Sequence, residues 1–440
     1  MTNIPKRVSN SILQSLSTGV VPRIGLQLIT VGRVNEVRAL VQDLETVADG
    51  GAAFRFVVGK YGSGKTFLLQ LIRNRAMELD LVVADVDLSP ERRLVGSAGQ
   101  GINTYRELVN NMATRTRPDK NALPLILDNW ISSIQVSVRN ESQLSTEDAE
   151  FNSAVEAKIM TVISNMEGMV HGFDFATVLT SYWRAYRNNH DQLKDAALKW
   201  LRGEYSTKTE ARDALGVRVI IDDTNYYDYL KVMARFVSNA GYKGLIVFFD
   251  EGVSLLKITH TPSRFANYEK LLMMFNDTMQ GKVENLGIIM SGTTEFVENT
   301  QRGLYSYEAL RSRLAASRFV REGFVDTSSP VISLQTLSHD EIYVLLTLIA
   351  QVHSSHYSYE CRLTSLDYQD FMQEILNRLG ADKLLTPREI VRDFISVLNI
   401  LHQNPQVSLP QLIHGTDFRP THSTIDPDIN DNNQAAELQL

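Results

Sequence analysis

The stretch that most constrains this chain is residues 54–72, which read as a buried strand, a glycine-rich loop and a helix. The apolar run Phe54–Val58 predicts the strand, and the apolar residues after Thr66 predict the helix. Between them, residues 59–66 read Gly-Lys-Tyr-Gly-Ser-Gly-Lys-Thr, which fits G-x-x-x-x-G-K-[S/T] at every fixed position. This arrangement predicts a phosphate-binding loop in an α/β fold.

Each fixed position of the loop has a chemical reason. Gly62 and Gly64 let the backbone turn and bring its N–H groups against phosphate oxygens. The following helix points its positive end at the same oxygens. Lys65 supplies a point charge for the β- and γ-phosphates, and the Thr66 hydroxyl is placed to bind Mg²⁺. The residues expected to contact the nucleotide here are Gly59, Tyr61, Gly62, Ser63, Gly64, Lys65, Thr66 and Phe67.

A second motif lies at residues 244–251, where a continuous apolar run ends in Asp250 and Glu251. Such a run is typical of a central parallel strand with its carboxylates at the C-terminal edge. We expect Asp250 to hold Mg²⁺, directly or through water. We expect Glu251 to orient or deprotonate an attacking water.

A further buried strand is predicted at Leu286–Met290, followed by Ser-Gly-Thr-Thr-Glu at residues 291–295. Beside the Asp-Glu strand, these polar residues can hydrogen-bond the attacking water or the γ-phosphate. A capped turn that begins a helix at Glu295 explains them equally well. Both interpretations stay open for Thr293 and Thr294.

Several arginines have two interpretations. Arg92 and Arg93 follow a strand predicted at residues 81–87, where they can approach the nucleotide, although surface or partner contacts are favoured. Arg311 and Arg313 lie near a helix end, as surface charges or as groups that reach a neighbouring subunit's γ-phosphate. Arg388 follows Thr386 and Pro387 at a helix start, where a cation works against the helix dipole, and this favours a functional role.

Composition limits the remaining possibilities. At 440 residues, with 43% apolar and 22% charged residues, the chain suits two or three globular domains. A net charge of −7 argues against a uniformly basic surface, although a local basic groove stays possible. Cys361 is the only cysteine, so no intrachain disulfide is expected. No apolar run has the length of a membrane span, and the N-terminus lacks a signal-peptide core, which favours a cytoplasmic protein without membrane contact.

The motifs together resemble AAA+ ATPases of the initiator type. Residues 59–66 match the Walker A motif of that family, and Asp250-Glu251 match its Walker B motif. Thr293 or Thr294 stands at the sensor-1 position, Arg311 and Arg313 at the positions of arginine fingers, and Arg388 in the sensor-2 helix. The resemblance implies ATP as ligand, Mg²⁺ as its cofactor, and a homo-oligomer.

More narrowly, the chain resembles ATP-binding proteins of bacterial phage-defence islands of the BREX type. The segments that carry this resemblance are residues 59–67, Leu198–Glu204 and Phe249–Glu251. It implies partners such as a helicase in an antiviral complex, and DNA as a possible ligand. The chain departs from compact AAA+ proteins by a long helical stretch before the Asp-Glu strand.

The expected fold is therefore an α/β P-loop NTPase of the AAA+ type, with a central parallel sheet, a large helical insertion and a C-terminal helical lid. The predicted segments are an N-terminal core part at 1–95, the insertion at 96–215, the rest of the core at 216–330, the lid at 331–414 and a disordered tail at 415–440.

The leading functional hypothesis is an ATPase that remodels or licenses a nucleic-acid-associated complex, with Lys65, Thr294, Glu251 and an arginine from a neighbour acting at the γ-phosphate. The alternative is a nucleotide-gated switch or scaffold subunit with little turnover. A phosphotransferase is disfavoured, because Glu251 suits water activation and no acceptor site is evident.

Overall fold

The computed structural model describes residues 4–142, 149–164, 171–315, 326–378 and 386–414. The chain divides into two compact units. One comprises Met1–Arg33, Tyr61–Phe67 and Gln335–Leu440, and the other comprises Val34–Lys60 and Leu68–Leu334. We call them the lid unit and the sheet unit. The tail at 415–440, predicted to be disordered, lies outside the described residues.

The sheet unit is built on one five-stranded sheet in which every strand pair is parallel. The strands are β1 (Ala52–Gly59), β2 (Val82–Asp87), β3 (Leu245–Asp250), β4 (Leu286–Gly292) and β5 (Val331–Leu334), and they lie in the order β2-β3-β4-β1-β5. The predicted parallel α/β sheet is thus confirmed. Residues 331–334 form β5 beside β1.

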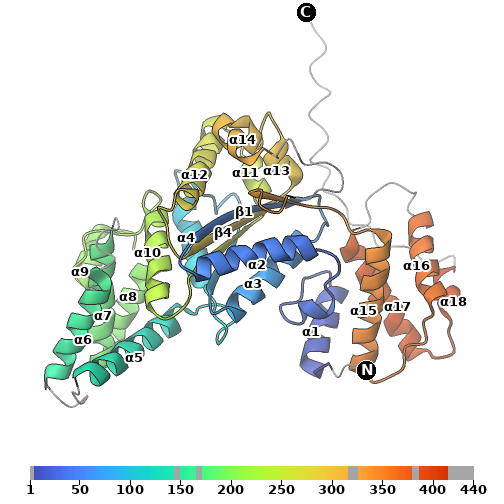
Figure 1. Ribbon diagram of the computed structural model, residues 1–440, viewed down its shortest axis with the longest axis horizontal. Helices are drawn as coiled ribbons and strands as arrows, with labels where there is room; N and C mark the ends of the chain where they lie inside the picture. Colours follow the sequence, from blue (N-terminus) through green and yellow to red (C-terminus); the bar gives the residue numbers. More distant parts are fainter. Residues whose placement is uncertain (1–3, 143–148, 165–170, 316–325, 379–385, 415–440) are drawn as a thin grey trace, which may run out of the picture. The chain divides into compact units, whose positions relative to one another are not determined.

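Both faces of the sheet are covered by helices, which is why its strands are mostly apolar. Phe56 and Val58 of β1 face a core shared with α4 (Gln100–Asn110), α10 (Tyr226–Asn239) and α12 (Thr261–Met279). Val57 faces the opposite way, into a core shared with α2 (Val34–Ala48) and α3 (Lys65–Glu78). Figure 1 shows α2 and α3 together along one side of the sheet.

A helical insertion was predicted at residues 96–215, and the described part of this range contains helices and no named strand. The helices after α4 are α5 (Leu123–Ser142), α6 (Ala149–Ser164), α7 (Gly172–Asn188), α8 (Asp191–Leu201) and α9 (Lys208–Leu215). Trp130, Trp183 and Trp200 are buried in their core. The sheet unit also contains α11 (Val253–Leu256), α13 (Thr294–Glu298), the short 3-10 helix η2 (Leu304–Ser306) and α14 (Glu308–Leu314).

The lid unit is a helical bundle. Its elements are α1 (Lys6–Ser17), the short 3-10 helix η1 (Leu26–Leu28), α15 (His339–Tyr357), α16 (Ser365–Arg378), α17 (Pro387–Gln403) and α18 (Leu409–Ile413). Helix α1 packs against α15 and α17, and Figure 1 shows α1 beside α15. The core includes Ile12, Leu346, Phe371 and Phe394. A capping box begins α15: Glu341 N–H donates to Ser338 Oγ, and Ser338 N–H donates to the Glu341 carboxylate.

The predicted domain boundaries, including an insertion at 96–215 and a lid from 331, remain predictions. In the described part of the chain, no helix combines the length and apolar character needed to cross a membrane.

Candidate functional site

The glycine-rich loop lies between β1, which ends at Gly59, and α3, which begins at Lys65. Gly62 and Gly64 have φ angles of 77° and 87°, in the left-handed region that side chains disfavour. A Cβ added at Gly62 would also lie 2.4 Å from Thr386 Cγ2, whereas nothing lies within 4 Å of one at Gly64. Glycine is therefore required at both positions, at Gly62 for space as well as for conformation.

The loop contains a buried polar atom suited to an anion site. Ser63 is 2% exposed, and its hydroxyl has no hydrogen-bond partner among the described residues. Leaving such a group unsatisfied is costly, and a bound phosphate would supply an acceptor. Lys65 and Thr66 are the first two residues of α3, at its positive end. Tyr61 is exposed at the loop, and Phe67 packs against the core of the lid unit.

Within the lid unit, the start of α17 lies against the loop. The Thr386 side chain contacts Gly62, and Thr386 is held by its own capping box, in which its N–H and hydroxyl both donate to the Glu389 carboxylate, at 3.0 and 3.1 Å. Arg388 is the second residue of α17 and is exposed, with its aliphatic carbons beside Gly19. The predicted N-cap Thr386 and first residue Pro387 are confirmed.

A residue that was not predicted also contacts the loop. Arg33 Nη2 donates to the Ser63 carbonyl at 3.0 Å and to the Gln335 carbonyl. In the sequence, Arg33 is only the residue before a helix. Its contact with Gln335 could not be predicted, because the two residues are 302 positions apart along the chain.

The acidic end of β3 is held by its neighbour β4, as expected for adjacent strands. Asp250 Oδ1 accepts hydrogen bonds from the Ser291 hydroxyl and, at 2.8 Å, from Glu251 N–H. Gly252 N–H donates to the Ser291 carbonyl at 2.9 Å. Glu251 is exposed and has a φ angle of 56°, in the left-handed region. The turn thus fixes the Asp250 carboxylate and leaves Glu251 at the surface.

A second carboxylate lies next to Asp250. Asp87 is its register partner on β2. Burial, and then the negative charge of Asp250, raise the pKa of Asp87. The two carboxylates therefore lie side by side at the edge of the sheet, where a cation would stabilise the charged form of both.

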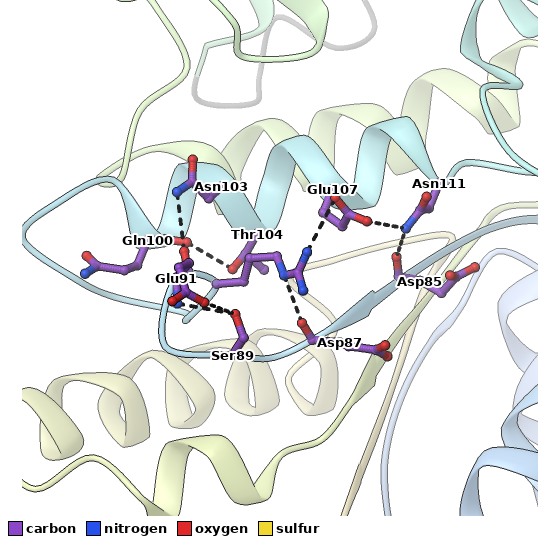
Figure 2. A network of polar contacts seen from close by, with 10 residues as sticks. Asp85, Asp87, Ser89, Glu91, Gln100, Asn103, Thr104, Glu107 and Asn111 are labelled. Carbon is purple, nitrogen blue, oxygen red and sulfur yellow. Dashed lines mark hydrogen bonds and ion pairs between the residues drawn. The ribbon is translucent and has the colours of Figure 1, made fainter.

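Arg92 is engaged close to this region. Its Nε donates to the Asp87 carbonyl at 3.1 Å, and its Nη1 lies 3.8 Å from Glu107 Oε2. Figure 2 shows Asp87, Glu107 and Asn111 in this network between β2 and α4, with Asn111 Nδ2 donating to the Asp85 carbonyl at 2.9 Å. Arg92 is thus occupied by contacts within the chain. Arg93 is half-buried, and its Nε has no partner among the described residues.

Of the two threonines after β4, Thr293 caps α13, since its hydroxyl accepts from Phe296 N–H at 3.2 Å. Thr294 is the first residue of that helix and is half-buried. The capped turn is therefore present, and it begins the helix at Thr294, one residue before the predicted Glu295. Arg311 and Arg313 are both exposed on α14.

The residues of the candidate site fall into two groups. Loop residues 61–67, Arg33 and Arg388 lie in the lid unit, whereas Gly59, Asp250, Glu251 and α14 lie in the sheet unit. The chain passes between the two units at residues 60–61, where β1 of the sheet unit leads into the loop, and again at residues 67–68, within α3. The carboxyl ends of β1, β3 and β4 meet at one edge of the sheet, where ligands of α/β proteins bind.

This parallel sheet and glycine loop define an α/β protein with a P-loop NTPase fold. The family model described as "BREX system ATP-binding protein BrxC/D" matches residues 4–417. The chain therefore belongs to the BREX ATP-binding family, and this membership implies ATP binding in phage defence. A comparison with curated proteins found no match.

Proposed function

We propose that this chain binds ATP with Mg²⁺ and hydrolyses it as an AAA+ type ATPase. The observation that carries the proposal is the turn at Asp250 and Glu251, with one carboxylate fixed by Ser291 and the next exposed. It lies at the sheet edge where β1 leads into the glycine loop. One carboxylate oriented toward a metal and a second, exposed carboxylate that can reach water are the two carboxylate roles that hydrolysis needs.

The residues fit a Mg²⁺ site with few protein ligands. In the parts of the chain that the structure describes, no group of three His, Cys, Asp or Glu side chains could hold a metal ion. Mg²⁺ bound with ATP does not need one, since it keeps several waters and takes one or two protein oxygens. Thr66 and Asp250 would hold it. When bound, Mg²⁺ neutralises charge on the β- and γ-phosphates.

The reaction follows from the roles of the side chains. Glu251 accepts a proton from water as the water oxygen attacks the γ-phosphorus, and the bond to the β–γ bridging oxygen breaks to release ADP. Lys65 and the loop N–H groups stabilise charge on the phosphates, and Thr294 hydrogen-bonds the water or the γ-phosphate. Arg388 acts from the lid, and Arg311 or Arg313 acts from a neighbouring subunit.

We further propose that ATP turnover in a homo-oligomer remodels or licenses a nucleic-acid-associated defence complex, with a partner such as a helicase and with DNA as a possible ligand. The family membership supports the setting in phage defence. The alternative is a nucleotide-gated switch or scaffold, in which ATP is bound with little turnover.

Nucleotide binding is tested with Lys65→Ala and the matched control Lys60→Ala, a lysine at a variable position of the same loop. Titration with a fluorescent ATP analogue should show binding lost or severely weakened for Lys65→Ala and nearly unchanged for Lys60→Ala. Wild-type affinity in Lys65→Ala would contradict the assignment of the loop.

Hydrolysis is tested by steady-state phosphate release with and without DNA. Turnover that DNA or a partner stimulates supports the remodelling ATPase. Tight ATP binding without turnover, with and without these additions, supports the switch.

A further inference from the structure

The inference concerns Arg33 and rests on the proposed function of the loop. Gly32 and Arg33 have consecutive φ angles of 64° and 63°, both in the left-handed region. Arginine rarely adopts this conformation, so the surroundings must enforce it. A Cβ added at Gly32 would lie 2.3 Å from the Glu341 carboxylate, so Gly32 is packed against the start of α15. The Arg33 side chain is therefore aimed by a strained, tightly packed turn.

That side chain holds one carbonyl of the glycine loop. Arg33 Nη2 donates to the Ser63 carbonyl oxygen at 3.0 Å. A hydrogen bond from a guanidinium is stronger than one between neutral groups, because the donor is charged. Arg33 is half-buried, which limits competition from water. The orientation of the peptide between Ser63 and Gly64 is therefore fixed by Arg33.

Fixing this carbonyl also fixes an N–H group. A peptide unit is planar and trans, so its C=O and N–H point in opposite directions. With the Ser63 carbonyl directed at Arg33, the Gly64 N–H points away from Arg33. Gly64 is exposed, with open space around the position of an added Cβ. The Gly64 N–H is thus presented as a donor for an anion in the loop.

The second acceptor of Arg33 lies in a different segment of the lid unit from the glycine loop. Arg33 also donates to the Gln335 carbonyl. Arg33 is the last residue of the N-terminal lid-unit segment, and Gln335 is the first residue of the C-terminal one. Ser63 lies in the short lid-unit segment Tyr61–Phe67. One guanidinium therefore joins the three chain segments at which the lid unit connects to the sheet unit.

We propose that Arg33 is a positioning residue that holds the loop in its phosphate-binding conformation by fixing the peptide between Ser63 and Gly64. It acts through the backbone and does not contact the nucleotide. The Arg33 guanidinium also binds the Gln335 carbonyl, at a point where the chain passes between the two units. A movement of Gln335 therefore alters the loop conformation, and phosphate bound in the loop stabilises the contact between Arg33 and Gln335.

The test uses Arg33→Gln, Arg33→Lys and the control Arg7→Gln, which removes an exposed arginine of α1 in the same unit. Hydrogen–deuterium exchange of the peptide covering residues 60–67 is measured without nucleotide. Arg33→Gln should speed exchange there, Arg33→Lys should do so less because it keeps a cationic donor, and Arg7→Gln should leave it unchanged. Unchanged exchange in Arg33→Gln would overturn the proposal.

Titration with ATP, ADP and AMP gives a second readout. Loss of one charge-assisted hydrogen bond should weaken ATP and ADP binding roughly ten- to a hundredfold. AMP binding should change less, because AMP lacks the β- and γ-phosphates that this loop is expected to hold. Equal weakening for all three nucleotides would indicate a general structural defect and contradict the proposal. If the wild-type chain binds no ATP, the proposed function fails, while the exchange experiment still decides the role of Arg33.

Discussion

The Ser291 hydroxyl of β4 donates a hydrogen bond to the Asp250 carboxylate at the end of β3. The Ser291 carbonyl accepts from Gly252 N–H on the far side of the same turn, at 2.9 Å. Ser291 is fully buried, so water does not replace either contact. One serine therefore sets the orientation of the proposed metal ligand and of the turn that carries Glu251.

Ser291→Ala should weaken Mg²⁺ binding. The variant keeps the backbone contact to Gly252 and removes the hydroxyl that orients Asp250. Loss of a partner that orients a metal ligand typically weakens metal affinity about 10- to 100-fold. Mg²⁺ titration of ATP turnover or of nucleotide binding measures the shift. The control is Ser254→Ala, since the Ser254 hydroxyl donates to the Leu88 carbonyl at 2.9 Å, close by but not to Asp250. An equal Mg²⁺ requirement in both variants would remove Ser291 from this role.

Glu251→Gln should separate binding from hydrolysis. Glutamine keeps the shape and hydrogen bonding of the side chain and loses the base, so ATP should bind with nearly wild-type affinity. Turnover should fall by at least about 100-fold, the usual contribution of a general base. Phosphate release and ATP titration measure the two effects, with Glu298→Gln on the neighbouring α13 as control. Turnover at the wild-type rate in Glu251→Gln would assign water activation to another group.

The parts of this fold that could be predicted are those with a strong local pattern. The apolar run at β3 ends in two acids, and the loop after β1 fits its motif at every fixed position. Both strands could therefore be predicted from short continuous stretches of sequence. The capping box at Ser338 and Glu341 is likewise local. Strand β5 was not predicted because Val331–Leu334 is only four residues long, too short for its alternation to be distinguished from a loop.

The parts that could not be predicted depend on contacts between distant residues. Ser291 is 41 positions from Asp250, and although the polar run after β4 was noted, nothing local selects the serine over the two threonines. Arg33 reaches Ser63 over 30 positions and Gln335 over 302. Such contacts follow from the topology of the sheet and the packing of the lid unit.

Stability should fall in mild acid because of His353, which is fully buried in the lid unit. Its Nε2 lies 3.1 Å from Asn399 Oδ1, which can only accept, so Nε2 carries the proton and Nδ1 accepts from the Tyr359 hydroxyl at 2.9 Å. Burial is the main cause that lowers the pKa of His353 below its ordinary 6.5, and His402 and His356 lower it further. The folded chain therefore binds fewer protons than the unfolded chain below about pH 6.5.

It follows that the contribution of His353 is fully present above pH 6.5 and is lost progressively as the pH falls from 6.5 toward the lowered pKa. Thermal unfolding between pH 8 and pH 5 measures the slope. His353→Gln should flatten it, whatever the variant's stability at pH 8. His339→Gln, at an exposed position of the same helix, should leave it unchanged. A slope that both variants share with the wild type would exclude His353 as the cause.

The last prediction concerns the two arginines of α14. Arg313 is held within the chain, since its Nε donates to Asn276 Oδ1 at 2.9 Å and its Nη1 to the Ala309 carbonyl at 2.7 Å. Arg311 is exposed, and no hydrogen bond or ion pair joins its side chain to another described residue. Arg311 is therefore the better candidate for a group that completes a neighbour's site. Arg311→Ala should lower turnover more than Arg313→Ala does.

An arginine supplied by a neighbour can contribute roughly 10³–10⁵ in rate, so the site would need an oligomer for activity. Mixing tests this directly. The Lys65→Ala chain is inactive in its own site but carries both arginines, and the Arg311→Ala, Arg313→Ala chain has an intact loop. If the site is shared, the mixture should regain ATP turnover that neither chain has alone, because the first chain supplies the arginine to the second. Full activity of the arginine-deficient chain by itself would show that both arginines are solvated surface charges.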